Sequence, residues 1–402
     1  MNFKEAKAKL SRYGLELSEE EFAQNQSKTV FCGMSGGVDS SVCALLLTLS
    51  GYKTVGLFMR NWEETDDNGV CSAQVDYEDV IKVCEQIDIP YYSVDFTKEY
   101  WDKVFSEFLK EYRAGHTPNP DILCNKEIKF NVFYKKAKEL GADLLATGHY
   151  CQKDGANGGI SLKKGVDRGK DQTYFLYTIQ EEILKEVLFP VGGLPKKIVR
   201  EIANDFKLAT SSKKDSTGIC FIGERNFKKF LAQYIESQAG FFARLEDNKI
   251  LGPHSGSCFY TVGQRKGLGL GGPGGPWFVA GKDTAANTVY VVEGEKHPAL
   301  YTDRLWIEQI SWVGRSPKLP LKCKAKIRYR QEDQDCAVSH DGQLLRVDFE
   351  KPQRAVALKQ SAVFYMEDIC LGGGVIVKVG ETLYQQNLSD SEALRNSNTL
   401  DR

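Results

Sequence analysis

The residues best suited to chemistry begin with a glycine-rich loop near the amino terminus. A short apolar run, Thr29–Cys32, precedes Gly33–Ser40 (GMSGGVDS), and apolar residues then recur at helical spacing over Val42–Leu49. This order predicts a buried strand, a tight turn and a helix, with residues 39–41 (DSS) as the helix cap. Unpaired N–H groups at a helix N-terminus favour an anion, and phosphate is the natural guest. The loop has no lysine and is neither a Walker A nor a G-x-G-x-x-G loop, and the alternative is a plain glycine turn in another doubly wound domain.

A second candidate site is the segment 117–130, TPNPDILCNKEIKF. Its two prolines exclude a helix before Asp121, so we expect a helix to start after that residue and to place Cys124 near its amino end. That position would lower the pKa of the thiol, and Lys126 and Lys129 add positive charge. Asp121 lies close enough along the chain to shuttle a proton. The alternative is a buried cysteine that behaves as a small hydrophobic side chain.

A second loop cysteine, Cys220, lies in KDSTGICFIG (214–223), after a charged run and before Phe221 and Ile222. The pattern fits a reactive thiol and a core cysteine at a strand edge equally well. Cys124 and Cys220 can meet across one site, although their spacing in the sequence does not prove a contact.

Positive charge alternates along residues 322–330, KCKAKIRYR. If this segment is a strand, one face carries five cations: Lys322, Lys324, Lys326, Arg328 and Arg330. Like charges at this spacing repel unless phosphate faces them, so the pattern favours RNA contact over an ordinary solvated face. Arg265 and Lys266 lie in a glycine-rich turn that suits a phosphate clamp or an exposed turn equally.

The elements that must position these groups alternate between strand and helix in the first half of the chain. Strands are expected at 29–32, 54–59, 91–96 and 143–147, and helices at 42–49, 77–87, 101–112 and 127–140. The alternation predicts a doubly wound parallel sheet. Ligands of such sheets bind beyond the carboxyl ends of the strands, where the glycine loop, Met59 and Gly148 fall.

The second half of the chain has a different texture. After residue 240 glycines and short alternating strands indicate a small central mixed or β domain, and evenly spaced strands over 305–376 indicate a β-barrel. The predicted domains are an N-terminal extension (1–27), a catalytic domain (28–213), a central domain (214–300), a C-terminal β-barrel (301–384) and a polar, disordered tail (385–402).

Composition limits the class of protein. At 402 residues, with 42% hydrophobic and 27% charged residues, the chain has room for two or three globular domains. A net charge of −1 requires any nucleic-acid surface to be a local patch. None of the 11 cysteines forms a C-x-x-C pair and the histidines lack metal-ligand spacing, so we expect free thiols and no metal site. The sequence shows no secretory signal and no membrane-spanning apolar run, which predicts a soluble, cytoplasmic protein without a membrane partner.

Seven motifs together resemble one family, the tRNA-specific 2-thiouridylases of the MnmA type. In chain order they are GMSGGVDSSV, TPNPDILCNKEIKF, ATGHY, KDQTYFLY, KDSTGICFIG, TVGQRKGLG and QSAVFY…CLGGGVI, and they run from about Thr29 to Ile376. The resemblance implies an adenine nucleotide alpha hydrolase-like, pyrophosphate-loop catalytic domain and a tRNA-binding β-barrel. It also implies ATP as the nucleotide, with Mg²⁺ to offset its charge.

Residue roles are carried over from the resemblance by position. ATP would be bound by Gly33, Met34, Ser35, Gly36, Gly37, Val38, Asp39, Ser40, Met59 and Gly148. The reaction would use Cys124, Cys220 and Asp121. The tRNA would contact Asn119, Pro120, Asp121, His149, Lys170, Asp171, Gln172, Arg328, Tyr329 and Gln360.

The resemblance also implies a mechanism, in which the C2 oxygen of the wobble uridine in the tRNA anticodon arm is adenylated and then replaced by sulfur. Cys220 would receive the sulfur as a persulfide from a donor protein, and Cys124 would release it and form a disulfide with Cys220. The protein would act as a monomer. Alternatives are another adenylating pyrophosphate-loop ligase or synthetase, a non-catalytic RNA-binding protein with a redox disulfide, and an iron–sulfur cluster held by Asp121, Cys124 and Cys220.

Overall fold

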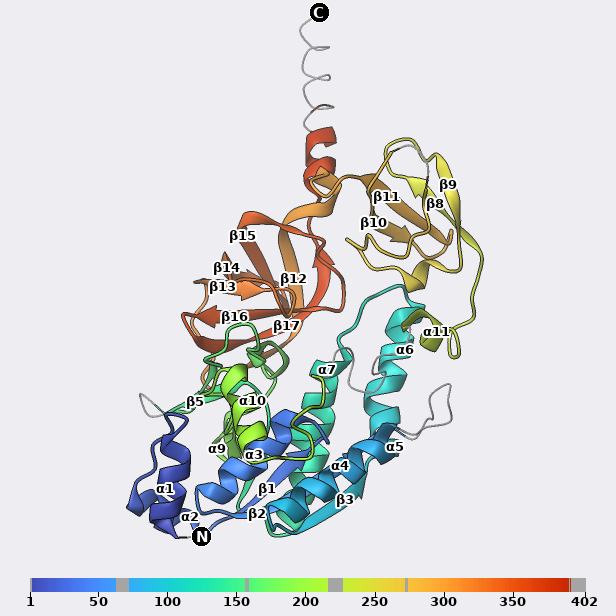
Figure 1. The fold of residues 1–402 in the computed structure, drawn as a ribbon. Coiled ribbons are helices and arrows are strands. Elements are labelled where there is room, and N and C mark those ends of the chain that lie inside the picture. Colours follow the sequence, from blue (N-terminus) through green and yellow to red (C-terminus); the bar gives the residue numbers. More distant parts are fainter. Residues whose placement is uncertain are drawn as a thin grey trace, which may run out of the picture.

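The chain forms three β-sheets, with short helices around the first (Figure 1). The computed structural model describes residues 2–62, 72–155, 159–215, 227–271, 274–389 and 391. Within these residues no helix is long and apolar enough to cross a bilayer.

The first sheet is parallel and has five strands in the order β3-β2-β1-β4-β7. Its strands are β1 (Thr29–Met34), β2 (Lys53–Arg60), β3 (Tyr91–Asp95), β4 (Leu144–Thr147) and β7 (Val187–Leu188). Strand β1 is buried on both faces, because Val30 and Cys32 pack into one apolar cluster and Phe31 packs into another.

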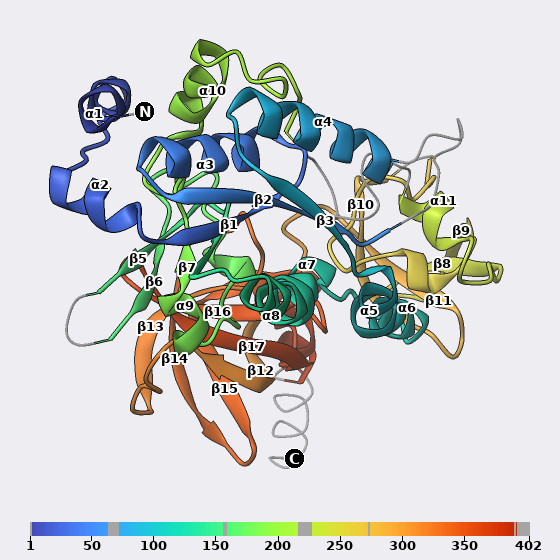
Figure 2. The ribbon, with the colours of Figure 1, turned by 90° about the horizontal axis from the view of Figure 1, so that it is seen from below.

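Helices cover both faces of this sheet (Figure 2). One side carries α3 (Val38–Leu49), α4 (Ser72–Gln86) and α10 (Lys196–Asp205). The other carries α8 (Tyr134–Glu139) and α9 (Glu181–Lys185). Strands buried between two helical layers are the doubly wound arrangement that the sequence predicts, so that fold prediction is confirmed.

Shorter elements complete this half of the molecule. They are α1 (Phe3–Ser11), α2 (Glu19–Asn25), α5 (Thr97–Tyr100), η1 (Trp101–Phe105), α6 (Ser106–Arg113), α7 (Pro120–Leu123), η2 (Cys124–Phe133) and η4 (Thr173–Phe175). Helices α1 and α2 each begin with a capping box, formed by Asn2 with Glu5 and by Ser18 with Glu21. They make up the expected N-terminal extension.

The second sheet has four strands in the order β10-β11-β8-β9. They are β8 (Gly240–Arg244), β9 (Ile250–His254), β10 (Trp277–Asp283) and β11 (Thr288–Glu293). Helix α11 (Phe227–Leu231) precedes this sheet, η5 (Ser257–Phe259) lies between β9 and β10, and η6 (Pro298–Leu300) follows β11. The β8 and β11 strands are parallel while the outer pairs are antiparallel, which fits the expected mixed sheet.

The third sheet closes into the predicted β-barrel, because β12 (Tyr301–Trp312) pairs with both β15 and β17. The other strands are β13 (Leu321–Lys326), β14 (Gln334–Asp341), β15 (Leu344–Arg354), β16 (Ser361–Met366) and β17 (Ile369–Val379). A hairpin of β5 (Cys151–Asp154) and β6 (Ser161–Lys164), from the first half of the chain, extends this sheet beside β17. Backbone pairing between β6 and β17 therefore connects the first half of the chain to the barrel. The predicted domain boundaries stay a prediction.

Two local expectations are wrong. Gly37 is the N-cap of α3, and the hydroxyls of Ser40 and Ser41 donate to its carbonyl from inside the helix. The tail is not irregular from residue 385, because residues 383–389 are helical. Helix α3 thus begins before the polar residues 39–41, and the helix at 383–389 includes the first polar residues of the expected tail.

Candidate functional site

The glycine loop leaves the carboxyl end of β1 and enters α3, as the sequence predicts. Gly36 has a φ of +70° and its missing Cβ would lie 2.5 Å from the carbonyl oxygen of Asp76, so only glycine fits there. Gly37 offers no side chain to the N–H groups in the first turn of α3. These N–H groups are therefore left for an anion such as phosphate.

Gly148 lies against the same turn of α3. A Cβ on Gly148 would be 3.0 Å from the backbone nitrogen of Ser40, so the β4 end and the glycine loop are in close contact. Met59 follows the β2 residue that pairs with Met34, which places it near the carboxyl end of β1. The structure thus brings all the predicted nucleotide-binding segments to one edge of the sheet.

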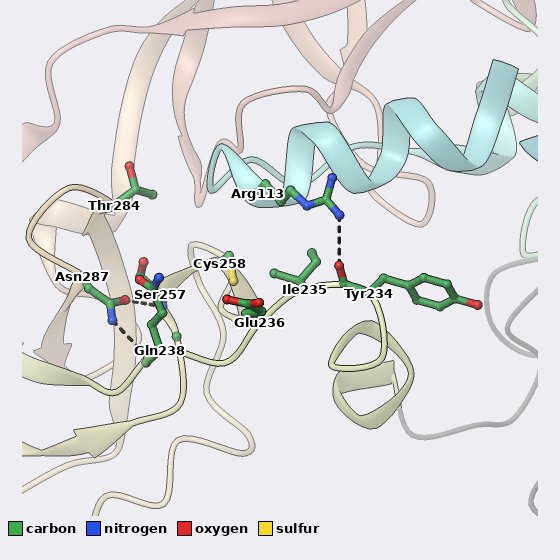
Figure 3. A pocket seen from close by; sticks show the side chains of 10 residues that line it. Arg113, Tyr234, Ile235, Glu236, Gln238, Ser257, Cys258, Thr284 and Asn287 are labelled. Atoms are coloured by element: carbon green, nitrogen blue, oxygen red, sulfur yellow. Dashed lines mark hydrogen bonds between the residues drawn. The ribbon is translucent and has the colours of Figure 1, made fainter. Parts of the chain in front are cut away.

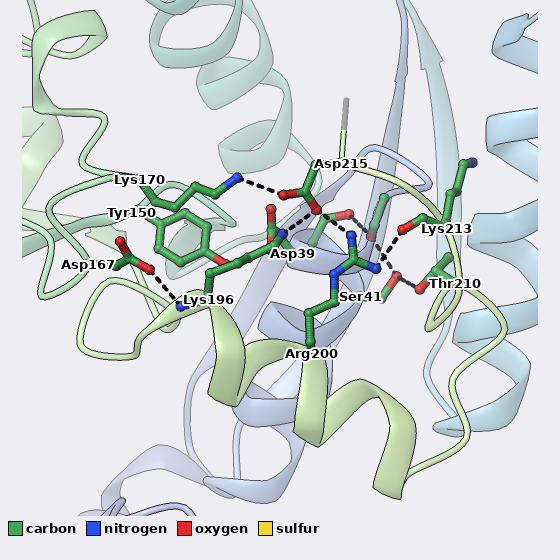
Figure 4. Close-up of polar contacts among 12 residues, drawn as sticks. Asp39, Ser41, Tyr150, Asp167, Lys170, Lys196, Arg200, Thr210, Lys213 and Asp215 are labelled. Carbon is green, nitrogen blue, oxygen red and sulfur yellow. Dashed lines mark hydrogen bonds and ion pairs between the residues drawn. The ribbon is translucent and has the colours of Figure 1, made fainter. Parts of the chain in front are cut away.

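Charged side chains surround this loop (Figure 4). The Asp39 carboxylate accepts hydrogen bonds from the Tyr150 hydroxyl at 2.7 Å and from Lys196 Nζ at 2.6 Å. Lys196 Nζ also lies 2.8 Å from Asp215 Oδ1, and Lys170 Nζ lies 2.7 Å from Asp215 Oδ2. Lys196 comes from α10, far along the chain from the loop, and the sequence motifs did not single it out.

Cys124 lies where a short helix changes to a π-helical segment. Asn119 caps α7 through its side-chain oxygen, and Pro120 is the first residue of the helix. The expectation that the helix starts after Asp121 is therefore wrong, because proline is well suited to the first helical position. The N–H of Cys124 already bonds within the helix, so the thiol does not sit at a free helix N-terminus.

Burial controls the acidity of this thiol. Cys124 is 1% exposed, and burial raises its pKa to about 11, while Lys129 lowers the pKa and Asp121 raises it. The predicted lowering of the pKa is thus wrong for the protein alone. In the π-helical segment η2 the hydrogen bonds join residues five apart, which brings Cys124 and Lys129 to one face.

His149 connects the thiol segment to the nucleotide loop. Its ring centroid lies 6.0 Å from that of Phe130 in η2, and its Nδ1 lies 2.7 Å from the Thr147 hydroxyl. Burial and the nearby Lys129 hold the pKa of His149 well below its usual value, so the imidazole is neutral. The predicted RNA contact of His149 would therefore be made by a neutral ring.

Other residues expected to contact tRNA lie near the boundary between the barrel and the parallel sheet. Gln360 Nε2 donates to the Thr117 carbonyl at 2.6 Å, which holds the barrel against the segment that leads to Asn119. The Tyr329 hydroxyl donates to the Lys170 carbonyl at 3.4 Å. Asp171 is 4% exposed. The contacts of Gln360 and Tyr329 thus join the barrel to segments of the first half of the chain.

Three of the residues expected to contact tRNA make internal contacts. The Asp171 carboxylate accepts from the N–H of Gly165 and from the Thr173 hydroxyl, so a role at tRNA would be indirect. Gln172 Oε1 accepts from the N–H of Tyr150 at 2.9 Å. Arg328 is half-buried and its guanidinium bonds to the Arg354 carbonyl.

The expected strand face with five cations does not exist. Strand β13 ends at Lys326, so Arg328 and Arg330 lie in the following turn. The Lys326 side chain is 11% exposed, with its Nζ 3.6 Å from Asp333 and 3.8 Å from Asp171. Lys322 is exposed, whereas Lys324 is partly exposed and its Nζ lies 3.2 Å from Asp335. Arg265 and Lys266 are both exposed in a turn.

Cys220 lies outside the described residues, so its predicted meeting with Cys124 stays a prediction. Within the described residues no three His, Cys, Asp or Glu side chains are grouped as metal ligands.

A cavity of about 410 Å³ lies away from this site, between the end of α6 and the central sheet (Figure 3). Arg113 donates to the Tyr234 carbonyl at 3.0 Å, and Asn287 Oδ1 accepts from the N–H of Ser257 at 2.9 Å. Cys258 also lines the cavity. Sequence motifs gave no signal for this cavity because its lining comes from four separate segments of the chain.

The loop Ser35–Ser40 (SGGVDS), which has no lysine and lies at the carboxyl edge of a doubly wound sheet, fits the pyrophosphate-loop class of α/β proteins. Three family models match the chain in order: a tRNA methyl transferase HUP domain (28–224), a tRNA methyl transferase PRC-barrel domain (228–293) and an aminomethyltransferase beta-barrel domain (302–376). The chain belongs to the tRNA-specific 2-thiouridylase family, as the curated relatives show.

The protein named tRNA-specific 2-thiouridylase MnmA from Protochlamydia amoebophila is 57% identical over 365 residues, which cover 90% of this chain and 96% of that protein. Its namesake from Bacillus subtilis is 54% identical and covers 86% of this chain and 94% of that protein. Among solved structures, the U34-tRNA thiolase NcsA from Methanococcus maripaludis covers 57% of this chain and 70% of its own, at 19% identity and a TM-score of 0.36, a likeness too low to carry an argument.

Proposed function

We propose that the protein is a tRNA-uridine 2-sulfurtransferase, which replaces the C2 oxygen of wobble uridine U34 with sulfur at the expense of ATP. The observation that carries this proposal is the near full-length identity to 2-thiouridylases, at 57%. The site geometry supports it, since the nucleotide loop and Cys124 are linked through His149 and Phe130.

The first half-reaction would activate the C2 oxygen. Backbone N–H groups of Gly33–Ser40 would hold the phosphates of ATP, with Mg²⁺ offsetting their charge, and Met59 and Gly148 would line the adenosine. The C2 oxygen attacks the α-phosphorus and pyrophosphate leaves, while Asp121 accepts the N3 proton of the uracil. The Asn119–Asp121 segment would hold the flipped base, because chemistry on a stacked base is out of reach.

The second half-reaction would deliver sulfur. A donor protein loads Cys220 as a persulfide, and the Cys124 thiolate attacks the Cys220 sulfur, releasing hydrosulfide and forming a Cys124–Cys220 disulfide. Hydrosulfide attacks C2, AMP leaves with the former C2 oxygen, and a dithiol reductant then restores both thiols. Because the pKa of Cys124 is about 11 in the protein alone, the attack requires a base or a change in solvation at this thiol.

The position of Asp215 supports the participation of Cys220. Asp215 is the last described residue before the Cys220 segment, and Lys196 ties it to the glycine loop. Cys220 follows Asp215 by five residues in the sequence, so the chain leads from the neighbourhood of the glycine loop directly into the segment that carries this thiol.

The tRNA would lie across the boundary of sheet and barrel, where the residues expected to contact it gather. A persulfide donor protein, a monomeric state and a cytoplasmic location complete the proposal.

The test is nucleoside mass spectrometry after incubation of unmodified tRNA with the protein, ATP and a persulfide donor. We expect 2-thiouridine at position 34 and AMP in equal amount. Cys220→Ser should still bind ATP and tRNA but form no 2-thiouridine, whereas Cys258→Ser, at a cysteine away from the site, should match the unmodified protein. Thiolation by Cys220→Ser would refute the persulfide role, and absence of any 2-thiouridine with the unmodified protein would refute the function.

A further inference from the structure

Triphosphate binding needs positive charge, and the glycine loop carries none. The only ionisable side chain in Gly33–Ser40 is Asp39, which is negative. In a Walker A loop a lysine reaches the β- and γ-phosphates, and this loop lacks one. The cation must therefore come from another part of the chain.

The structure provides such a cation at the start of α10. Lys196 Nζ lies 2.6 Å from Asp39 Oδ1, although 157 residues separate them in the sequence, and its side chain is 13% exposed. The backbone N–H of Lys196 donates to Asp167 Oδ2 at 3.0 Å, which fixes the start of the helix (Figure 4). A partly buried, anchored ammonium group beside the loop is unlike a solvated surface lysine.

Two more cations meet Lys196 at a single carboxylate. Asp215 is paired with Lys170, Lys196 and Arg200 (Figure 4). Burial acts to raise the pKa of Asp215, yet the hydrogen bonds from Lys170, Lys196 and Arg200 hold it well below its usual range. With Asp39 and Asp167, three carboxylates balance these three cations, so a phosphate gains their full charge only when a carboxylate moves away.

We infer that Lys196 and Arg200, with Lys170, form the binding site for the β- and γ-phosphates of ATP and for the pyrophosphate product, and that the Asp215 carboxylate occupies this anion site when no phosphate is present. Phosphate oxygens and a carboxylate present the same acceptors to ammonium and guanidinium groups. Bound pyrophosphate therefore displaces Asp215 from these cations. The inference rests on the proposed function, because it assigns residues to the same ATP reaction.

The cluster has two opposite consequences for binding. Removal of a cation should weaken phosphate binding, whereas removal of the competing charge on Asp215 should strengthen it. A purely structural ion-pair cluster predicts instead that both changes disturb the loop and weaken every ligand.

The experiment is calorimetric titration of the full chain with inorganic pyrophosphate, ATP and AMP. Lys196→Gln should weaken pyrophosphate and ATP about tenfold or more and leave AMP within about twofold, because AMP lacks the two outer phosphates. Lys196→Arg should restore most of the lost affinity. Lys197→Gln removes the neighbouring exposed lysine and should change none of the three affinities.

A second variant, Asp215→Asn, removes the competing negative charge and should tighten pyrophosphate binding by several-fold. Unchanged pyrophosphate affinity in Lys196→Gln, or an equal loss of AMP affinity, would overturn the inference, as would weaker pyrophosphate binding in Asp215→Asn. Thiolation by the unmodified protein is measured on the same preparation. If the unmodified protein thiolates tRNA but Lys196→Gln binds pyrophosphate with unchanged affinity, only this inference is rejected. If the unmodified protein does not thiolate tRNA, the proposed function is rejected.

Discussion

The acidity of Cys124 gives a prediction that follows directly from the structure. An ordinary cysteine has a reference pKa of 9.0, and burial raises that of Cys124 to about 11. A rise of two units lowers the thiolate fraction at neutral pH about 100-fold. Since only the thiolate is nucleophilic, alkylation of Cys124 in the folded protein should be slowed by about that factor relative to the same cysteine in the unfolded chain.

The assay is the rate of iodoacetamide modification of Cys124, followed by peptide mass spectrometry between pH 7 and 10. We expect the rate in the folded protein to rise about tenfold per pH unit without reaching a plateau. In urea-unfolded protein the same rate should level off near pH 9. Restricted reagent access lowers the rate at every pH, whereas a shifted pKa moves the plateau, so the profile separates the two effects.

Replacement of Lys129 tests the electrostatic part of this reasoning. Lys129 lowers the pKa of Cys124, so Lys129→Gln should move the profile to higher pH by about half a unit to one unit. Lys126→Gln is the matched control, because Lys126 is half-exposed and pairs with Glu127. A plateau near pH 8–9 in the folded wild-type protein, or an equal shift in both lysine variants, would refute the reasoning.

Two further predictions concern the loop and the basic strand. Gly36→Ala should lower the free energy of unfolding by about 2 kcal/mol and weaken ATP binding, because φ is +70° and the added Cβ meets Asp76. Gly37→Ala is the control: its Cβ would lie 3.5 Å from the nearest atom, so a urea melt should show little loss of stability. Equal losses in the two variants would contradict the geometry. Lys326→Gln should cost about 1–3 kcal/mol of stability without changing the salt dependence of tRNA binding. Lys324→Gln, at a partly exposed lysine paired with Asp335, should leave stability within about 0.5 kcal/mol and reduce the salt slope by about one unit if that strand meets phosphate. The opposite assignment of the two effects would restore the expected cationic face.

The nucleotide loop could be predicted from the sequence, whereas the surroundings of Cys124 and of the basic strand could not. The strand, glycine loop and helix over 29–49 could be predicted because neighbouring residues dictate them: apolar runs, glycine permissiveness and helical spacing are all local. The order of strands and helices also predicted the parallel sheet and the edge where ligands bind. The seven motifs added the family, which the curated relatives confirm.

The predictions were wrong where a local sequence pattern was used to infer the burial and the partners of a side chain. The alternation in 322–330 predicted one cationic face, but the strand ends at Lys326, and Asp171 and Asp333 enclose that lysine. The helix expected to acidify Cys124 begins earlier, at Pro120, and the thiol is buried. Partners that decide burial come from segments far away in the chain, and no local spacing reports them.

By itself, the sequence determined the nucleotide loop, the fold class and the candidate thiols, since these depend on residue type and on neighbours a few positions away. Only the tertiary structure decided that Lys196 supplies the cation beside Asp39, that Cys124 is a weak acid in the protein alone, and that the β5–β6 hairpin joins the barrel. These properties depend on desolvation and on charge pairs between distant segments, which exist only once the chain has folded.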